Sequence, residues 1–123
     1  MIDAMIDIET LDTANTAIVL QVAVVTFDVD TFELQSQNSW YLNVDVQKES
    51  GRTWSTATLQ WWLNQPNDTQ QEVLLPAFGV QAHHPDIVMS ELHTLLKDKD
   101  IRYVWSQGSF DFDIIENMMG SRA

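Results

Sequence analysis

The apolar run at residues 17–27, AIVLQVAVVTF, constrains the fold more than any other part of this chain. It is nearly continuous in hydrophobic side chains, it is rich in β-branched residues, and polar residues flank it on both sides. Its length, branching and polar flanks disfavour a helix, and a strand without a polar face is one that other elements cover on both sides. We therefore expect a buried central strand here.

Two more strands are predicted beside it. Residues 2–9 (IDAMIDIE) alternate between Ile or Ala and Asp, Met or Glu, which is the two-residue period of a strand. Residues 32–46 (FELQSQNSWYLNVDV) supply the third strand after a short turn at residues 28–30. Because the links between the three are short, they predict an antiparallel meander.

Helices are predicted in the middle of the chain. Ser55 or Thr56 can cap a helix that runs to about Gln65, where Pro66 ends it, and a second short helical stretch follows at residues 68–75. Two segments without periodicity are expected to be irregular: residues 48–53 and 76–84.

Three elements are predicted in the last third of the chain. Pro85 suits the first position of an amphipathic helix that continues through Lys97. Residues 101–105 (IRYVW) predict a short buried strand, which can lie parallel to the first strand because a helix precedes it. Residues 110–119 predict a final helix.

The order of these elements, β-β-β-α-(α)-α-β-α, resembles the opening of a ribonuclease H-like fold, an α/β fold with a mixed sheet. That fold normally continues with another strand and a closing helix, and neither follows in this sequence. We therefore expect residues 1–123 to form a single, partial domain that is incomplete at its C-terminal end.

Composition narrows the class of protein. A chain of 123 residues with 45% hydrophobic residues can bury a real core as one domain. It has no cysteine, no apolar run of about 20 residues, and acids rather than basic residues at its start. These features predict a soluble cytoplasmic protein without disulfide or thiolate chemistry.

The charge is unusual for a protein that binds nucleic acid. Eighteen acidic residues against six basic ones give a formal net charge of −12. Nucleic-acid binding proteins normally carry a basic surface, because neutralising phosphates supplies much of their affinity. Either nucleic acid is not the partner, or the acids hold metal ions and a basic surface lies elsewhere.

Asp7 and Glu9 are the first candidates for chemistry. Two residues apart on a strand, they point to the same face with Cα atoms roughly 6.5–7 Å apart. Like-charged carboxylates on a buried strand repel each other unless a cation lies between them, and Mg²⁺ or Mn²⁺ is the hard ion that suits such oxygen ligands. The alternative is an edge strand with a solvated acidic face.

Asp111 and Asp113 are the second candidates. They follow the predicted strand at residues 101–105 and begin a helix, so one of them could meet the acids of the first strand at the carboxyl edge of the sheet. Phe110 and Phe112 would anchor this helix start in the core. The alternative is an acid that only caps the helix or complements its dipole.

Three segments together resemble the DEDD class of metal-dependent 3′–5′ exonucleases, in particular the DEDDh phage and prophage enzymes related to exonuclease VIII and exonuclease A. DIETLDT before the long apolar run is similar to the first motif of that class, and VWSQGSFDFDII resembles the second. Between them, SGRTWSTATLQWWLNQPNDTQQEVL resembles a family helix with a Thr-x-x-Trp-Trp pattern followed by Gln. Its matching residues here are Thr58, Trp61, Trp62 and Gln65.

The resemblance implies roles for the acids. Asp7 and Glu9 match the first two catalytic, metal-binding carboxylates. Asp111 matches the third, because Phe-Asp-Phe-x-Ile-Ile fits the family pattern from that residue without a gap. Asp113 stays as the alternative, since the family usually has one more residue between the glycine and Phe-Asp.

Substrate contacts are implied as well. Thr10 and Leu11 match positions that touch the terminal nucleotide, Thr10 through its backbone and Leu11 under the base. Trp61 and Trp62 are about 100° apart on a helix, so one can lie in the core while the other, expected to be Trp61, faces a cleft and stacks on a base. The alternative is that both pack internally.

The third motif of the family, a histidine with an aspartate five residues on, does not follow the second motif here. His93 and Asp98 have that spacing, but they precede the second motif and lie on a predicted amphipathic helix. We therefore expect them to be surface residues rather than catalytic ones. His83 and His84 are expected to be loop residues or a weak, adventitious metal site.

In a complete enzyme of this kind, the resemblance implies two divalent ions held by four carboxylates and a histidine base, acting on the 3′ end of single-stranded DNA or RNA. The chain is then expected to be a truncated exonuclease or one piece of a split enzyme, completed by a C-terminal fragment or by a second copy in a homodimer. If phage-encoded, it would work in the host cytoplasm.

Two alternatives to an active nuclease remain: a catalytically silent remnant that acts by binding, and an unrelated acidic interaction domain. For the nuclease we expect the carboxylates of Asp7, Glu9 and Asp111 to converge within reach of a metal ion.

Overall fold

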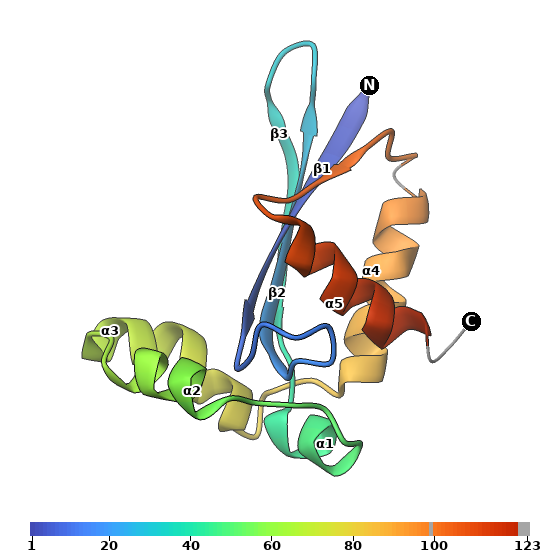
Figure 1. Ribbon diagram of the computed structural model, residues 1–123. Coiled ribbons are helices and arrows are strands. Elements are labelled where there is room, and N and C mark those ends of the chain that lie inside the picture. The colour runs from blue at the N-terminus through green and yellow to red at the C-terminus, as the bar shows by residue number, and fades with distance from the viewer. Residues whose placement is uncertain (99, 121–123) are drawn as a thin grey trace.

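Three long strands and one short strand form a single mixed sheet in the computed structural model, which describes residues 1–98 and 100–120 (Figure 1). The strands are β1 (Ile2–Thr10), β2 (Val19–Asp28), β3 (Leu34–Tyr41) and β4 (Val104–Trp105), in the order β3-β2-β1-β4. The first three pair as an antiparallel meander, and β4 lies parallel to β1. The mixed sheet predicted from the sequence is confirmed.

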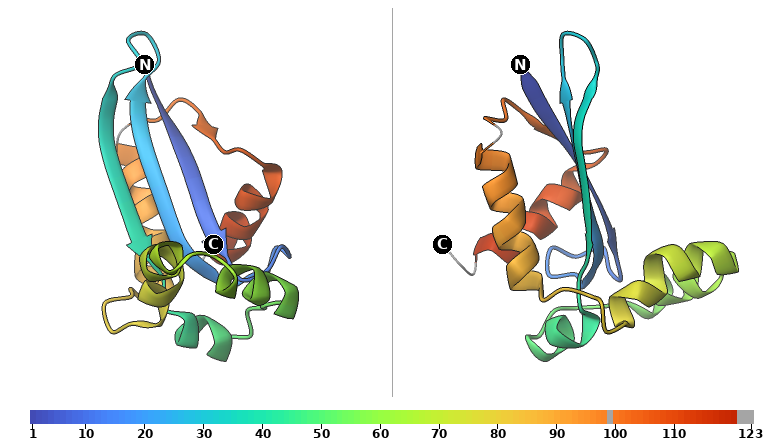
Figure 2. Two further views of the ribbon diagram at one scale, coloured as in Figure 1. Left: turned by 90° about the vertical axis from the view of Figure 1, so that its left-hand side faces the viewer. Right: turned by 180° about the vertical axis from the view of Figure 1, so that it is seen from behind.

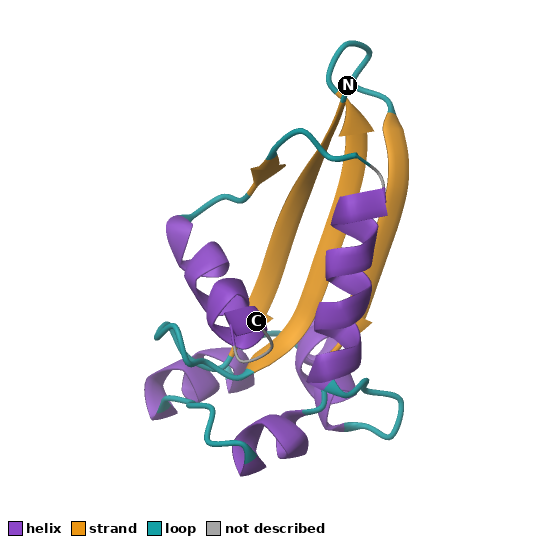
Figure 3. Ribbon diagram, turned by 90° about the vertical axis from the view of Figure 1, so that its right-hand side faces the viewer, coloured by secondary structure: helices purple, strands orange, loops and turns teal. Residues whose placement is uncertain are grey.

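Two helices cover one face of this sheet. They are α4 (Pro85–Asp98) and α5 (Ser109–Gly120), and both lie on the same side in every view (Figures 2 and 3). Alternate residues of β1, such as Ile6 and Ile8, meet Leu92 of α4 and Ile114 of α5 in the main core. The two-residue period of β1 therefore leaves its odd-numbered side chains on the other face.

The remaining helices gather where β1 finishes. α1 (Val44–Glu49) and α2 (Thr56–Leu63) lie there, and α3 (Asn67–Thr69) continues through a π-helical turn at Gln70–Leu74 and a 3₁₀ turn at Leu75–Phe78. In Figure 2, α2 and α3 extend from that end of the sheet toward the face opposite α4 and α5. This second layer therefore covers only one end of that face.

β2 is buried on both faces only where both layers reach it. At its start, Val19 packs in the core beside α4 and α5, and Leu20 packs in a second cluster with residues of α2 and the following turns. Further along, Ala23 and Val25 are half-buried and line a cavity of about 260 Å³ together with Asp7. The prediction of a strand covered on both sides thus holds for its first residues alone.

The predicted third strand is too long, and its end is a helix. β3 ends at Tyr41 and α1 follows almost at once. The Asn43 side chain accepts a hydrogen bond from the Val46 N–H at 3.0 Å and caps α1. The buried Gln47 side chain bonds the N–H and the C=O of Val19, each at 2.8 Å. A helix cap and a buried polar anchor override the strand-like alternation of residues 42–46.

Two other boundaries differ from prediction. The strand expected at residues 101–105 is only two residues long, and Trp105 is exposed because β4 forms the edge of the sheet. The helical stretch expected at residues 68–75 extends from Asn67 to Phe78. No helix in the described part of the chain has both the length and the apolar character needed to cross a membrane.

Candidate active site

The second half of β1 carries two acids away from the core. Ile6 and Ile8 point into the core between the sheet and the helices, so Asp7 and Glu9 point to the opposite face. Asp7 is exposed, whereas Glu9 is half-buried. The local alternation of the sequence is sufficient to place both carboxylates on one side of the strand.

Asp111 joins them from the first turn of α5. It is 5% exposed, and its carboxylate accepts a hydrogen bond from the Ile8 backbone N–H on β1. Asp113, two residues later, is exposed. Buried Ile114 and Ile115 fix the helix against the core, which turns Asp111 toward β1.

The electrostatics of the three acids show that they lie close enough to repel one another. Burial, followed by the charges of Asp7 and Asp111, raises the pKa of Glu9 to about 7. Burial and the charge of Asp7 also raise the pKa of Asp111, although its hydrogen bond from Ile8 lowers it in part. A cation between these groups would remove the repulsion and favour their charged forms.

A preformed metal cluster is not present. Among residues 1–98 and 100–120, no three His, Cys, Asp or Glu side chains are grouped closely enough to hold an ion. The expected convergence of Asp7, Glu9 and Asp111 within reach of one metal is therefore not met in this conformation. Like-charged carboxylates separate when no cation holds them together. The hard oxygen donors of the three acids, and the raised pKa values of Glu9 and Asp111, nevertheless fit Mg²⁺ or Mn²⁺.

A cavity of about 400 Å³ opens beside Glu9 and runs to α2. Glu9 and Thr10 form one side of it, Thr58 and Trp61 of α2 another, and Phe110 closes it from the start of α5. Phe110 is 40% exposed, so the prediction that it anchors α5 in the core is wrong. No local signal in the sequence marks Phe110 as a residue that lines a cavity.

The two neighbouring tryptophans divide as predicted. Trp62 is buried and its indole Nε1–H donates to the Thr10 carbonyl at 2.7 Å, which ties α2 to the end of β1. Trp61 is exposed, lines the cavity, and meets Trp62 edge-on with ring centroids 4.9 Å apart. Trp62 therefore links α2 to the end of β1, and Trp61 faces the cavity.

Leu11 does not line the cavity beside Glu9. It is 4% exposed and packs in the smaller apolar cluster with Ile18 and Trp62. It lines a second cavity on the other side of the β1 terminus rather than the one beside Glu9. Thr10 does line the cavity beside Glu9, and its hydroxyl donates to the Asp12 carbonyl at 2.6 Å.

None of the three histidines lines the cavity beside Glu9. His93 and Asp98 are exposed on α4, which packs on the sheet face away from Asp7. His84 accepts a hydrogen bond from the Asp86 backbone N–H at 3.0 Å through its Nδ1. His83 contributes its backbone to the loop, where it bonds Tyr41 and the start of α1.

A further buried carboxylate was not foreseen from the sequence. Asp3, on the same face of β1 as Asp7, is 1% exposed and accepts two hydrogen bonds from Arg102, each at 3.0 Å. The Trp105 indole donates a third at 2.8 Å. These partners, first among them Arg102, lower the pKa of Asp3 to about 2. The sequence pattern places Asp3 on the same face of β1 as Asp7 and Glu9, but it gives no sign that Asp3 is buried or paired.

The fold is shared with exonucleases of known structure. Exonuclease I of E. coli, in complex with a 5cy-dA13 oligonucleotide, matches with a TM-score of 0.66 at 13% identity, over 97% of this chain and 24% of that one. The nuclease domain of 3′hExo, a DEDDh family member bound to rAMP, matches with a TM-score of 0.61 at 15% identity, over 98% and 58%. The ribonuclease H-like exonuclease fold predicted from the order of elements is confirmed.

Sequence relatives agree with the fold. The exodeoxyribonuclease of Enterobacteria phage T4 is 29% identical over 79 residues, which cover 59% of this chain and 35% of the phage protein. The chain thus spans about a third of the length of that relative, and less of exonuclease I. Residues 2–122 match the family described as the 3′–5′ exoribonuclease Rv2179c-like domain. With nearly its whole length inside that match, the chain belongs to the Rv2179c-like family of 3′–5′ exonuclease domains.

Proposed function

We propose that Asp7, Glu9 and Asp111 are ligands of a divalent-metal centre in a 3′–5′ exonuclease that hydrolyses phosphodiester bonds at the 3′ end of single-stranded nucleic acid. The observation that carries this proposal is the grouping of three carboxylates beside an aromatic-lined cavity, where burial and then the charges of Asp7 and Asp111 raise the pKa of Glu9 to about 7. Crowded acids of this kind are stable in their charged form only when a cation is bound.

Asp111 is favoured over Asp113 as the third ligand. Asp111 is buried, is coupled to Asp7 and is oriented by the Ile8 N–H, whereas Asp113 is exposed on the next part of α5. A ligand needs to approach the other two acids, and only Asp111 has an interaction with them.

The side chains around the cavity suit a terminal nucleotide. Trp61 and Phe110 present aromatic surface on which a base can stack whatever its identity. Thr10 lines the cavity beside Glu9, close to where the terminal phosphodiester would lie. When bound, divalent ions supply an activated water and stabilise the charge on the leaving 3′ oxygen. The proposed role of Trp61, Phe110 and Thr10 is to hold the 3′ end of the strand beside those ions.

The remaining ligand and the general base are not among the groups that line the cavity beside Glu9. In the 123 residues, all three histidines precede Asp111, and none lines the site. We propose that both groups come from residues other than these, in the same polypeptide, in a separate C-terminal fragment or in a second copy. The half-covered face beside Asp7, with Met5 and Val25, is where such a segment would pack.

Two finer points belong to the same proposal. The T4 relative and the Thr-x-x-Trp-Trp helix support the phage and prophage group related to exonuclease VIII. Carboxylate-bound metals act on DNA and RNA alike, and the names of the relatives include both an exodeoxyribonuclease and an exoribonuclease domain. The substrate class is therefore single-stranded nucleic acid with a free 3′ end.

A thermal melt with and without Mn²⁺ tests the metal centre. An ion at about 100 times its dissociation constant adds about 2.7 kcal/mol to the free energy of unfolding, so the melting temperature of the wild type should rise. Asp7→Asn and Asp111→Asn should remove that rise, whereas the matched control Asp113→Asn should retain it. A melt that ignores Mn²⁺, or a rise lost only in Asp113→Asn, would contradict the assignment.

Digestion of 3′-labelled single strands tests the chemistry. The 123-residue chain alone should cleave both DNA and RNA slowly, since a missing general base costs roughly 10²–10⁴ in rate. Adding a C-terminal fragment that carries a His-x-x-x-x-Asp motif should restore the rate, and Asp7→Asn should abolish it again. If the metal binds but no fragment restores cleavage, the domain is a binding remnant and not a nuclease.

A further inference from the structure

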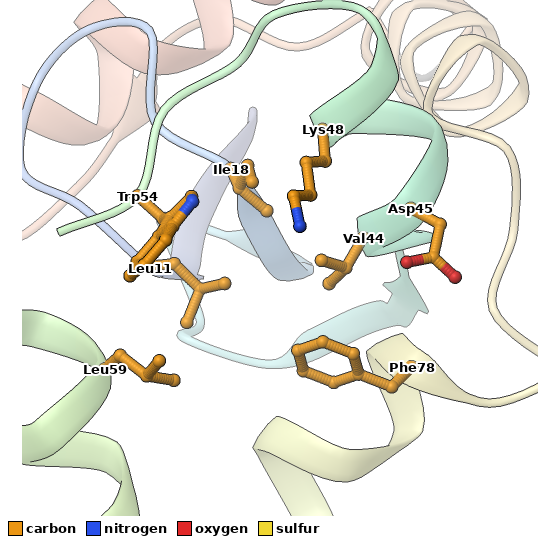
Figure 4. A pocket seen from close by; sticks show the side chains of 8 residues that line it. All are labelled: Leu11, Ile18, Val44, Asp45, Lys48, Trp54, Leu59 and Phe78. Atoms are coloured by element: carbon orange, nitrogen blue, oxygen red, sulfur yellow. The ribbon is translucent and has the colours of Figure 1, made fainter. Parts of the chain in front are cut away.

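A second cavity lies on the far side of the β1 terminus from Glu9. It has a volume of about 180 Å³ and sits between α1, the start of α2 and the 3₁₀ turn at Leu75–Phe78 (Figure 4). Its walls are mostly apolar: Leu11, Ile18, Val44, Trp54, Leu59 and Phe78. No role in the metal centre accounts for it.

Two aromatic side chains at this cavity are left open to solvent. Trp54 is 47% exposed and Phe78 is 50% exposed, although both contribute to an apolar lining. Figure 4 shows them on different sides of the enclosed space, with Trp54 near Leu11 and Phe78 across from it. Flat apolar surface of this kind binds planar ligands, and bases of single strands are the planar groups that such platforms take.

The second cavity adjoins the cavity beside Glu9 in two segments of the chain, where neighbouring residues line one cavity and then the other. Thr10 lines the cavity beside Glu9, and the next residue, Leu11, lines the second one. In α2, Thr58 faces the first cavity and Leu59 faces the second. A strand whose 3′ end lies beside Glu9 would therefore cross the residues at the end of β1 and in α2 to reach the second cavity.

One basic and one acidic side chain line the second cavity, Lys48 and Asp45. Lys48 lines the second cavity, and Figure 4 shows its side chain directed into the space near Val44. It makes no ion pair within the described residues, whereas Arg52 and Arg102 are held by hydrogen bonds to other parts of the fold. The first turn of α2 has no acidic residue that would repel a phosphate.

We infer that the cavity between α1 and α2 is a second nucleotide subsite, which takes an unpaired base upstream of the 3′ end between Trp54 and Phe78 while Lys48 meets the adjoining phosphate. This inference rests on the proposed function, because the strand reaches the subsite from the cavity beside Glu9. It assigns binding of a longer strand to residues outside the metal centre.

The five tryptophan indole N–H signals of the protein provide the test. They are recorded by two-dimensional NMR in Ca²⁺, which takes oxygen ligands as Mg²⁺ does, and Trp54→Phe and Trp61→Phe assign the two relevant signals. A nucleoside monophosphate should shift the Trp61 signal and leave Trp54 in place. A short oligothymidylate should shift both.

Affinity measurements complete the test. Trp54→Ala and Lys48→Ala should weaken oligothymidylate binding, the former by roughly 5- to 100-fold, which is the value of one base–aromatic stack. Both should bind the monophosphate as the wild type does, and Trp54→Phe should retain most of the strand affinity. Glu49→Gln, an exposed change on α1, is the control.

The two ways of failing are distinguishable. If the monophosphate and the oligonucleotide leave both indole signals unchanged, the proposed function itself fails and the subsite fails with it. If the oligonucleotide shifts Trp61 alone, or if Trp54→Ala weakens the monophosphate as much as the strand, the nuclease centre stands and the second subsite is refuted.

Discussion

The two ends of strand β1 hold their carboxylates in opposite ways. Near the start, Asp3 is almost fully buried, receives three hydrogen bonds from Arg102 and Trp105, and has its pKa lowered to about 2. Near the end, half-buried Glu9 faces the like charges of Asp7 and Asp111, and its pKa is raised to about 7.

The difference shows that a favourable partner can outweigh burial, and that burial raises the pKa of a carboxylate that lacks one. Burial raises the pKa of both Asp3 and Glu9, but the guanidinium beside Asp3 more than reverses that effect. The satisfied carboxylate ties β4 to β1, a structural role that the Arg102 N–H bond to the Ile2 carbonyl strengthens. The unsatisfied one is the group that gains from a bound cation.

A tryptophan indole donates a hydrogen bond at each end of β1, but to a different kind of acceptor. Trp105 donates its N–H to the Asp3 carboxylate, whereas Trp62 donates to the backbone carbonyl of Thr10 and leaves Glu9 without a donor. At the proposed active-site end, the indole bond goes to the backbone and not to a carboxylate.

Replacing Asp3 should reduce stability more than any substitution at the other end of β1. Asp3→Asn removes the negative charge and leaves the Arg102 guanidinium without its counter-charge, and breaking one partner of a buried pair is strongly destabilising. Urea unfolding at pH 7 should show a lower midpoint, while Mn²⁺ should still raise the melting temperature of the folded fraction. Asp113→Asn, an exposed change, should stay within about 0.5 kcal/mol of the wild type.

The contrast between the two ends fails if Asp3→Asn is harmless, because the pair would then be no more than a surface contact. It also fails if the substitution removes the Mn²⁺ response of the folded protein, since the two ends of β1 would then not be independent.

Trp62→Phe should produce the next largest effect. It leaves the buried Thr10 carbonyl without its donor, which costs about 1–3 kcal/mol, and it removes volume from the smaller core cluster. Chemical denaturation measures the loss. The neighbouring change Trp61→Phe is the matched control, since Trp61 is exposed and should lose nucleotide affinity with little change in stability. If Trp62→Phe and Trp61→Phe lowered the free energy of unfolding equally, Trp62 would not be the structural indole of the pair.

The contrast between the ends of β1 also explains how much the sequence could predict. Alternation over residues 2–9 places Asp7 and Glu9 on one face, and a two-residue period is a local property. The partners of Asp3 lie 99 and 102 residues away, so no local pattern reveals that it is paired. The site acids were therefore predictable, and the structural acid was not.

The errors in the fold have the same origin. Residues 42–46 alternate like a strand over too few positions to separate a strand from a helix start, and the Asn43 cap decides between them. Phe110 was expected to anchor the start of α5 in the core, but the core is filled by Ile114 and Ile115 of the same helix. Short patterns fail where a tertiary contact makes the choice.

Glu9→Gln should have the smallest effect on stability and the opposite sign. In the metal-free protein, the folded state holds the Glu9 proton more tightly than the unfolded chain does, since its pKa is about 7 instead of 4.5. The free energy of unfolding should therefore fall as the pH rises through that interval, with Asp111 acting in the same direction. Asp3 acts oppositely, because its contribution is present above 3.8 and is lost as the pH falls toward 2.

Above pH 7 the ionised Glu9 destabilises the folded state. Glu9→Gln should therefore raise the free energy of unfolding at pH 8 by on the order of 1–2 kcal/mol. This range is reduced to allow for solvent screening of a half-buried group. The variant should also flatten the fall between pH 4.5 and 7, and saturating Mn²⁺ should flatten it in the wild type by favouring the charged carboxylates. Urea titrations at a series of pH values measure this, with the exposed Glu116→Gln on α5 as the control. If Glu9→Gln were less stable than the wild type at pH 8, the Glu9 carboxylate would have a favourable partner within the fold, and the two ends of β1 would not differ in kind.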